Sequence, residues 1–291
     1  MNYCLAKALP QFRPMVWGNP ELNKEFNIPE SQTNLPIGEI WLLSGHPLYE
    51  TTLENGLTIN QFGHNLYNGK YPRFPILIKL VSTNQWLSVQ VHPDDEYARN
   101  VEEEPWGKSE AWYFLTDGEF AICEDVEKMK EYINSGRINQ LDEILTFVKV
   151  KKGTFVNIPA GTVHALGPNS TVIEVQQSSD LTYRIYDWGR PRETHLEKAL
   201  QVSKTISLND IVFENSDTLK TEYFCMQKSL SQDDLNRNNL IVHIPTQISK
   251  NYCAKLIINE NICKDYNSYR KVGNPIEELG SGIFVTNFLT I

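Results

Sequence analysis

Short segments rich in β-branched and aromatic residues, bounded by Gly, Pro, Asn and Asp, make up most of the hydrophobic pattern of the chain. Seven of them predict strands, at residues 37–44, 76–81, 87–92, 110–115, 120–124, 154–158 and 171–177. Asp117-Gly118 lies between two of these segments and predicts a tight hairpin turn. Because the segments follow one another without alternating helices, the pattern predicts a mainly β chain built as a jelly roll or barrel.

Helical periodicity is concentrated in one stretch, at about residues 125–147. Apolar residues recur there at helical spacings, namely Val126, Met129, Ile133, Ile138, Leu141 and Leu145. Gly136 divides the stretch, which therefore predicts two short amphipathic helices inserted into the β framework.

The composition changes after about residue 203, where Asn, Ser and isolated charges become more frequent. The strand candidates in this part, at residues 240–244, 254–258 and 282–289, are weaker. We therefore predict a larger domain at residues 1–203, which carries the helical insert, and a second, smaller β domain at residues 204–291.

Composition and charge narrow the possible partners of the 291-residue chain. Hydrophobic residues make up 41% and charged residues 22%, which is typical of a globular protein. The 36 acidic and 27 basic residues give a net charge of -9, which argues against a nucleic-acid partner. No run approaches the roughly 18 apolar residues of a membrane span, and the first residues lack the apolar stretch of a signal peptide. Five cysteines without a Cys-x-x-Cys pair predict free thiols in a reducing compartment, so we expect a cytoplasmic protein with no membrane partner.

The strongest chemical signal is the segment LSVQVHP at residues 87–93. Side chains alternate between the two faces of a strand, so Gln90 and His92 share a face and lie about 7 Å apart along it. The segment GKSEAWYFL, at residues 107–115, places Lys108 and Glu110 together in the same way.

A third segment, GTFVNIPAGTVHAL at residues 153–166, has the spacing of the second cupin motif, in which a strand, a Pro-x-Gly turn and a returning strand present a metal-binding histidine. That histidine is His164. Two neutral imidazoles, from His92 and His164, and the carboxylate of Glu110 suit zinc with an open position for water or substrate. Gln90 is a possible fourth ligand. Each residue alone is more often structural, but three motifs in one chain favour a metal site.

The sequence resembles the mannose-6-phosphate isomerases of the short bacterial class I type, which belong to the cupin superfamily. The resemblance spans about residues 14–202 and rests on four motifs that occur in the order of the family: QVHP, GK-x-E, PAG-x-x-HA and SSD-x-TYR. It implies a zinc-dependent enzyme that interconverts mannose 6-phosphate and fructose 6-phosphate through an enediol intermediate. The implied ligands of one zinc ion per chain are His92, Glu110 and His164, with Gln90 beside them.

The resemblance also implies a set of catalytic residues, which comprises Lys108, Glu174, Asp180 and Arg184. Glu174 is the first candidate for the base that moves a proton between C2 and C1, with Lys108 and Asp180 behind it. The alternative for Glu174 is a structural carboxylate paired with a neighbouring base. Arg184 is expected to stabilise charge or to bind phosphate through its planar fork, the alternative being an exposed salt bridge.

Two other functions are compatible with these motifs. The segment after residue 203 lacks a Pro-x-Gly-x-x-His sequence and matches a second cupin domain only loosely, which allows a non-catalytic paralogue that binds sugar phosphates. The ligand set also allows a redox metal, and thus a metal-dependent oxygenase on the same scaffold. The sequence makes no prediction of the oligomeric state.

Overall fold

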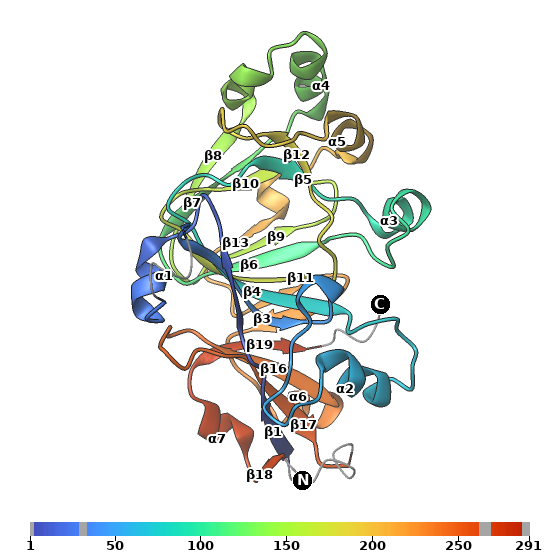
Figure 1. Cartoon of the computed structure of the whole chain (residues 1–291), viewed down its shortest axis with the longest axis vertical. Helices are drawn as coiled ribbons and strands as arrows, with labels where there is room; N and C mark the ends of the chain where they lie inside the picture. The colour runs from blue at the N-terminus through green and yellow to red at the C-terminus, as the bar shows by residue number, and fades with distance from the viewer. Residues whose placement is uncertain (1–2, 29–33, 262–268, 287–291) are drawn as a thin grey trace.

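The computed structural model describes residues 3–28, 34–261 and 269–286, which form three antiparallel sheets stacked in layers (Figure 1). The C-terminal sheet has the order β14 (Thr218–Lys220), β15 (Cys225–Gln227), β19 (Gly282–Thr286), β16 (Leu240–Pro245), β17 (Lys255–Asn259), β1 (Tyr3–Lys7) and β18 (Arg270–Val272). The central sheet has the order β13 (Val212–Phe213), β9 (Phe155–Ile158), β6 (Glu110–Phe114), β11 (Thr171–Gln177), β4 (Ile76–Ser82), β3 (Ile37–Ser44) and β2 (Gln11–Pro14). The small sheet has the order β12 (Tyr183–Tyr186), β5 (Val89–Val91), β10 (His164–Leu166), β7 (Gly118–Ile122) and β8 (Thr146–Val150).

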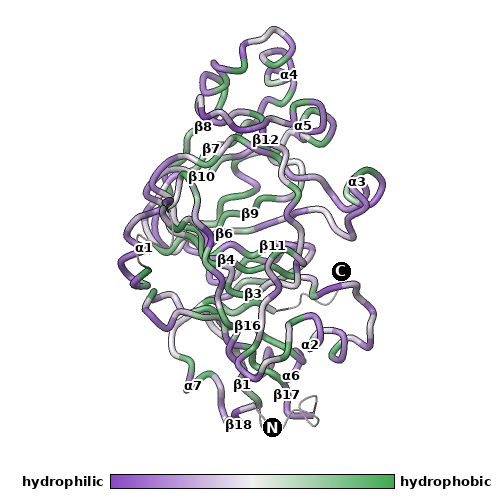
Figure 2. Tube along the Cα trace, viewed as in Figure 1, coloured by the Kyte–Doolittle hydropathy of each residue, from purple (hydrophilic) through white to green (hydrophobic). Residues whose placement is uncertain are grey.

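Helices are short and lie around the sheets. They are α1 (Pro20–Glu25), α2 (Ile59–Leu66), α3 (Asp95–Val101), α4 (Val126–Asn134), α5 (Leu196–Val202), α6 (Gln232–Arg237) and α7 (Pro275–Leu279), with 3-10 turns η2 (Pro47–Tyr49), η3 (Ile138–Ile144) and η4 (Leu208–Asp210). Figure 2 shows hydrophobic segments concentrated in the stacked sheets and hydrophilic ones in the outer helices and loops. No helix in the described part of the chain combines the length and the apolarity that a membrane crossing requires.

The central sheet is buried on both faces, and this explains its nearly continuous apolar sequence. In β4 all seven residues are buried. Ile78 and Leu80 belong to the core shared with the C-terminal sheet, whereas Val81 belongs to the core shared with the small sheet. The small and central sheets therefore face each other around an apolar core, and the predicted mainly β class is confirmed.

The predicted strand at residues 37–44 matches β3 in full, and the one at 171–177 matches β11. The hairpin predicted at Asp117-Gly118 is wrong. β6 pairs with β9 and β11 in the central sheet, whereas β7 pairs with β8 and β10 in the small sheet. The chain crosses between the two facing sheets at this turn, because both strands bury apolar side chains in the core between the sheets.

The helical insert is confirmed by α4 and η3, which Gly136 separates with a φ of +74°. Met129 of α4 and Leu141 of η3 join the apolar core on the outer face of the small sheet. The insert therefore covers this sheet and lies away from the C-terminal sheet (Figure 1).

Strands from residues 1–203 pair with strands from residues 204–291 in two of the sheets. β1 lies between β17 and β18 in the C-terminal sheet, and β13 pairs with β9 of the central sheet. The division at residues 203 and 204 stays a prediction. The last residues of the strand predicted at 282–289 lie outside the described residues, as does Cys263, whereas Cys4, Cys123, Cys225 and Cys253 are free thiols.

Candidate metal centre and active site

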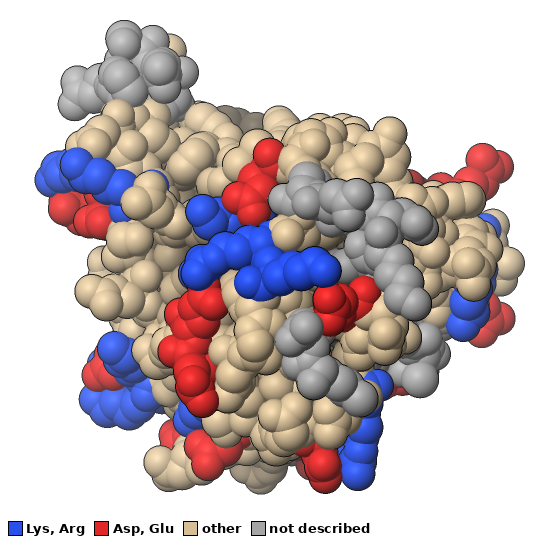
Figure 3. Space-filling model, turned by 90° about the horizontal axis from the view of Figure 1, so that it is seen from below, with Lys and Arg blue, Asp and Glu red and all other residues tan. Residues whose placement is uncertain are grey.

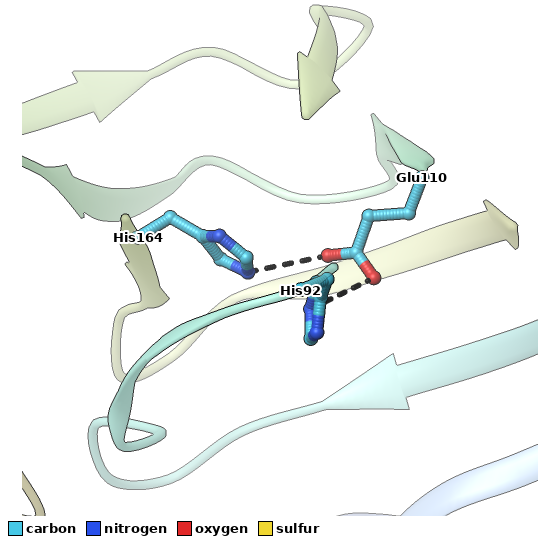
Figure 4. A group of neighbouring side chains, drawn as sticks. All are labelled: His92, Glu110 and His164. Carbon is cyan, nitrogen blue, oxygen red and sulfur yellow. Dashed lines mark ion pairs between the residues drawn. The ribbon is translucent and has the colours of Figure 1, made fainter. Parts of the chain in front are cut away.

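Three of the predicted ligands meet between the small and central sheets. His92 follows β5 directly, Glu110 is the first residue of β6, and His164 is the first residue of β10. One ligand atom from each of them lies within 4.8 Å of the others. Glu110 Oε2 is 3.5 Å from His92 Nε2, and Glu110 Oε1 is 3.3 Å from His164 Nε2 (Figure 4).

Main-chain carbonyls orient both imidazoles. His92 Nδ1 is 2.9 Å from Leu181 O, and His164 Nδ1 is 2.9 Å from Thr162 O. A carbonyl oxygen only accepts hydrogen bonds, so each Nδ1 carries the proton and donates it. The lone pair of each ring is consequently on Nε2, the atom that faces Glu110, as metal-binding histidines require.

The three side chains are at most 1% exposed, and the charge states of His92 and Glu110 favour a cation. Burial and the neighbouring Lys108 ammonium hold the pKa of His92 well below its usual value. Burial alone would raise the pKa of Glu110, but Lys108 and then His92 outweigh it and hold the pKa well below its usual range. Both carboxylate oxygens of Glu110 and Nε2 of His164 are buried and make no hydrogen bond of ordinary geometry within the described residues. Two imidazole nitrogens and a carboxylate gathered in this way fit a divalent metal ion.

Lys108 lies directly beside the predicted metal ligands. Its Nζ is 2.9 Å from Glu110 Oε2 and 3.1 Å from His92 Nε2. The predicted proximity of Lys108 and Glu110 is confirmed by this contact, although β6 begins at Glu110 and does not include Lys108.

The Pro-x-Gly turn joins the two histidine-bearing segments. Gly161 has a φ of +96°, a conformation that favours glycine, and its amide donates to His92 O at 2.9 Å. The turn therefore fixes the main chain of His92 while it leads into β10 and His164.

A cavity of about 350 Å³ is lined by Lys108, the side chain that contacts Glu110 and His92. The predicted site residues on its wall are Gln90, Lys108, Glu174, Asp180 and Arg184. Charged wall residues that the sequence reasoning missed are Arg13, Glu39, Lys79 and Arg192.

Glu174 lies on the cavity face of β11, a point that the alternation of the strand could not decide. Its Oε1 is 2.9 Å from Lys79 Nζ, and its Oε2 accepts a hydrogen bond from Trp112 Nε1 at 3.1 Å. Burial alone would lower the pKa of Lys79, but Glu174 and then Glu39 outweigh it and raise the pKa, so the lysine stays charged. A signal for Lys79 was present in the sequence, because it is a single charge inside the apolar segment at residues 75–81.

Arg184 and Gln90 are register partners on neighbouring strands of the small sheet. Arg184 Nη1 donates to Glu193 O at 2.7 Å, and burial followed by the nearby Arg192 lowers its pKa. The amide oxygen of Gln90 accepts a hydrogen bond from Ser88 Oγ at 3.2 Å. A metal-ligand role for Gln90 stays a prediction, as do the catalytic roles of Glu174, Asp180, Lys108 and Arg184.

Known proteins with similar sequences and folds are isomerases. Residues 5–123 match the family model described as phosphomannose isomerase type I, catalytic domain. A mannose-6-phosphate isomerase of Streptococcus mutans is 36% identical over 214 residues, which cover 68% of this chain and 65% of that protein. The mannose-6-phosphate isomerase ManA of Bacillus subtilis is 36% identical over 217 residues, which cover 68% of each chain. The chain thus spans about two thirds of the length of these relatives.

The same likeness extends to the fold. The crystal structure of the mannose 6-phosphate isomerase from Bacillus subtilis superposes with a TM-score of 0.70 and 25% identity, and the match covers 98% of this chain and 99% of that one. The coverage includes the residues after 203, whose sequence resembles the family only loosely.

Proposed function

The chain belongs to the mannose-6-phosphate isomerase family, and on this premise we propose that it interconverts mannose 6-phosphate and fructose 6-phosphate. The observation that carries the proposal is the buried group of His92, Glu110 and His164, which Lys108 connects to a cavity of about 350 Å³. A cavity of this size accommodates a small ligand.

His92, Glu110 and His164 would hold one zinc ion, with Gln90 as a further ligand. Two imidazoles and a carboxylate are a common ligand set of catalytic zinc. When bound, the zinc ion supplies Lewis-acid polarisation of the substrate oxygens. The hydrogen bonds from the two Nδ1 atoms to main-chain carbonyls support this role, because they fix both rings.

Glu174 would be the base of the proton transfer. It would remove the proton from C2 of the open-chain aldose, so that the electron pair of that bond forms the C1=C2 double bond of the enediol and the carbonyl pair of C1 moves to O1. The protonated Glu174 would then deliver a proton to C1 of the enediol as O2 loses its proton and C2 becomes the carbonyl carbon. Lys108 and Asp180 would move the hydroxyl proton between O2 and O1. Lys79 supports the assignment because its ammonium group, 2.9 Å from Glu174 Oε1, fixes the position of the carboxylate on the cavity wall.

The test is an isomerase assay of the purified full-length protein, with the metal content measured in the same samples. We expect turnover that a chelator removes and zinc restores. His164→Ala should lose the metal and the activity together, whereas Arg184→Ala should lose activity and keep the metal. A zinc-loaded protein that neither isomerises mannose 6-phosphate nor exchanges its C2 proton with solvent would contradict the proposed function.

A further inference from the structure

The loop that follows β12 brings two arginines onto one buried carboxylate. Asp187, which is 3% exposed, accepts hydrogen bonds from Arg190 Nη2 at 2.6 Å and from Arg192 Nε and Nη2 at 2.5 and 2.7 Å. The two bonds from Arg192 go to different oxygens of the carboxylate. This bidentate geometry fixes the plane of the Arg192 guanidinium.

The two arginines differ in their other contacts. Arg190 Nη2 also donates to Trp86 O at 2.7 Å, so this side chain ties the loop to the main chain of the neighbouring segment. Arg192 lies on the cavity wall with 29% of its side chain exposed. No hydrogen bond from its Nη1 is found among the described residues, which leaves this nitrogen available to a ligand.

The loop itself is held in one conformation. Trp188 and Gly189 both have positive φ values, of +54° and +80°. A positive φ is uncommon for a tryptophan and persists only where the surroundings fix it. Here the indole Nε1 donates to Leu87 O at 2.6 Å. Arg192 is therefore carried on a rigid support.

Positive charge is in excess only at this end of the cavity. Elsewhere on the wall each basic side chain has a carboxylate partner: Arg13 with Glu39, Lys79 with Glu174, and Lys108 with Glu110. The three arginines Arg184, Arg190 and Arg192 stand against two carboxylates, those of Asp187 and Glu193. Asp180 also lines the cavity and interacts electrostatically with Lys79. An anionic group of a ligand is thus favoured at the arginine-rich loop.

We propose that Arg192 binds the phosphate group of the substrate and that Asp187 is the positioning residue that holds it. The identity of the substrate rests on the proposed function. A phosphate monoester carries up to two negative charges, and the Nη1 that Asp187 leaves free can donate hydrogen bonds to its oxygens. Arg184 is the register partner of Gln90, and Gln90 lies two positions before His92 in the sequence. One molecule can therefore reach from the metal ligands to this loop.

Arg192→Met tests the inference, because Met keeps the length of the side chain and removes the charge. Binding of inorganic phosphate to the full-length protein is measured by calorimetry, and turnover is measured with mannose 6-phosphate and with unphosphorylated mannose. We expect the Kd for phosphate and the KM for mannose 6-phosphate to rise by about tenfold or more, the loss typical of hydrogen bonds to a charged group. kcat should stay within about twofold, because the contact is made equally in the ground and transition states. kcat/KM for mannose should not change.

Arg13→Met is the matched control, because Arg13 lies on the wall of the same cavity but pairs with Glu39. Its Kd for phosphate should equal that of the wild type. An unchanged Kd in Arg192→Met, or an equal rise in Arg13→Met, would overturn the inference. Arg192→Lys should give an intermediate Kd, because it keeps the charge without the fork.

Asp187→Asn separates positioning from general structure. The variant should raise KM for mannose 6-phosphate and leave kcat nearly unchanged, whereas a fall in kcat with an unchanged KM would contradict a positioning role. Should Asp187→Asn fail to fold, the Arg192 variants still decide the inference.

The phosphate inference and the proposed function can fail separately, because calorimetry with inorganic phosphate needs no turnover. A protein that binds phosphate through Arg192 but does not isomerise contradicts the proposed function alone. An active enzyme whose Arg192→Met variant keeps the wild-type Kd contradicts this inference alone.

Discussion

Side chains of the site depend on partners that lie outside it. Main-chain carbonyls of Leu181 and Thr162 orient the rings of His92 and His164. The charge partner of Glu174 is Lys79, which lies on β4. The grouping of His92, Glu110 and His164 was predictable because each belongs to a local motif with a fixed spacing. Lys79 was not, because its role depends on pairing between β4 and β11, whose residues are separated by about ninety positions.

Glu174→Gln tests the proton carrier. The amide has the size of the carboxylate but does not take up the C2 proton, so we expect kcat to fall by about 10²–10⁴, the usual contribution of a general base. The metal content should not change. Asp180→Asn is the comparison, and we expect a smaller fall in kcat there. A larger effect of Asp180→Asn on C2 proton exchange in D2O would assign the base to Asp180.

His243 should make stability depend on pH. Burial and then Lys255 lower its pKa to about 4, whereas the pKa of an unfolded histidine is about 6.5. Between these values the unfolded chain binds a proton that the folded protein does not, so stability falls as the pH falls, by up to about 3 kcal/mol. Urea unfolding at pH 7, 5.5 and 4.5 measures this loss.

His243→Leu should remove this contribution and become more stable relative to the wild type as the pH falls. The control is His64→Leu, because His64 is exposed on α2. It should keep the pH dependence of the wild type. Parallel pH profiles of the wild type and His243→Leu would show that burial of this ring is not coupled to stability.

At the scale of elements, the strands were predictable and their pairing was not. Alternation and composition within one segment identified β3 and β11 with their full bounds. The turn at Asp117-Gly118 has the sequence of a hairpin, but the tertiary core assigns its flanking strands to facing sheets. Local chemistry determines that the chain turns, whereas the burial of apolar side chains determines which strands then pair.

The Pro-x-Gly turn offers a comparison between two glycines. Gly161 and Gly136 both have positive φ values, and an alanine in that conformation costs roughly 1–2 kcal/mol. A Cβ on Gly136 meets no atom within 4 Å, whereas one on Gly161 meets the Lys204 side chain at 2.8 Å. Gly161 also donates its amide to His92 O. Both alanine variants should therefore lose stability, Gly161→Ala the more because of its contact with Lys204, and only Gly161→Ala should disturb the predicted metal ligands.

We expect Gly161→Ala to weaken zinc binding by about tenfold or more, as loss of a contact that supports a metal ligand usually does. Gly136→Ala should bind zinc like the wild type. Zinc titration against a competing chelator measures both affinities, and thermal unfolding measures both stabilities. Equal zinc affinities in the two variants would mean that the turn is a structural element without influence on His92.

For the whole molecule, a net charge of -9 coexists with a locally positive cavity end. Figure 3 shows the end of the molecule that carries the C-terminal sheet, where basic side chains form a band and acidic ones lie directly beside it. Charges of both signs are thus interspersed on this surface. The net charge still argues against polyanionic partners, whereas a small phosphorylated ligand responds to the local field of the arginine-rich loop.

The N-terminal strand ties the two ends of the chain into one structure. Leu5 of β1 pairs with Ile257 of β17 and Arg270 of β18, and its side chain is 7% exposed in the core on the outer face of the C-terminal sheet. Leu5→Ala should cost about 2–5 kcal/mol by leaving a cavity there. Because the strand lies between β17 and β18, amide hydrogen exchange should accelerate in both of them, although they are more than 240 residues away in sequence.

Phe12→Ala is the matched control in the same N-terminal segment. Phe12 lies on β2, an edge strand of the central sheet, and is 37% exposed. Its loss should cost less and leave exchange in β17 and β18 unchanged, because the strand pairs only with β3 among the described residues. Unchanged protection of β17 and β18 in Leu5→Ala would show that residues 204–291 hold their sheet without β1, as two domains divided at residue 203 require. Accelerated exchange would instead mean that the C-terminal sheet forms only when both ends of the chain are present.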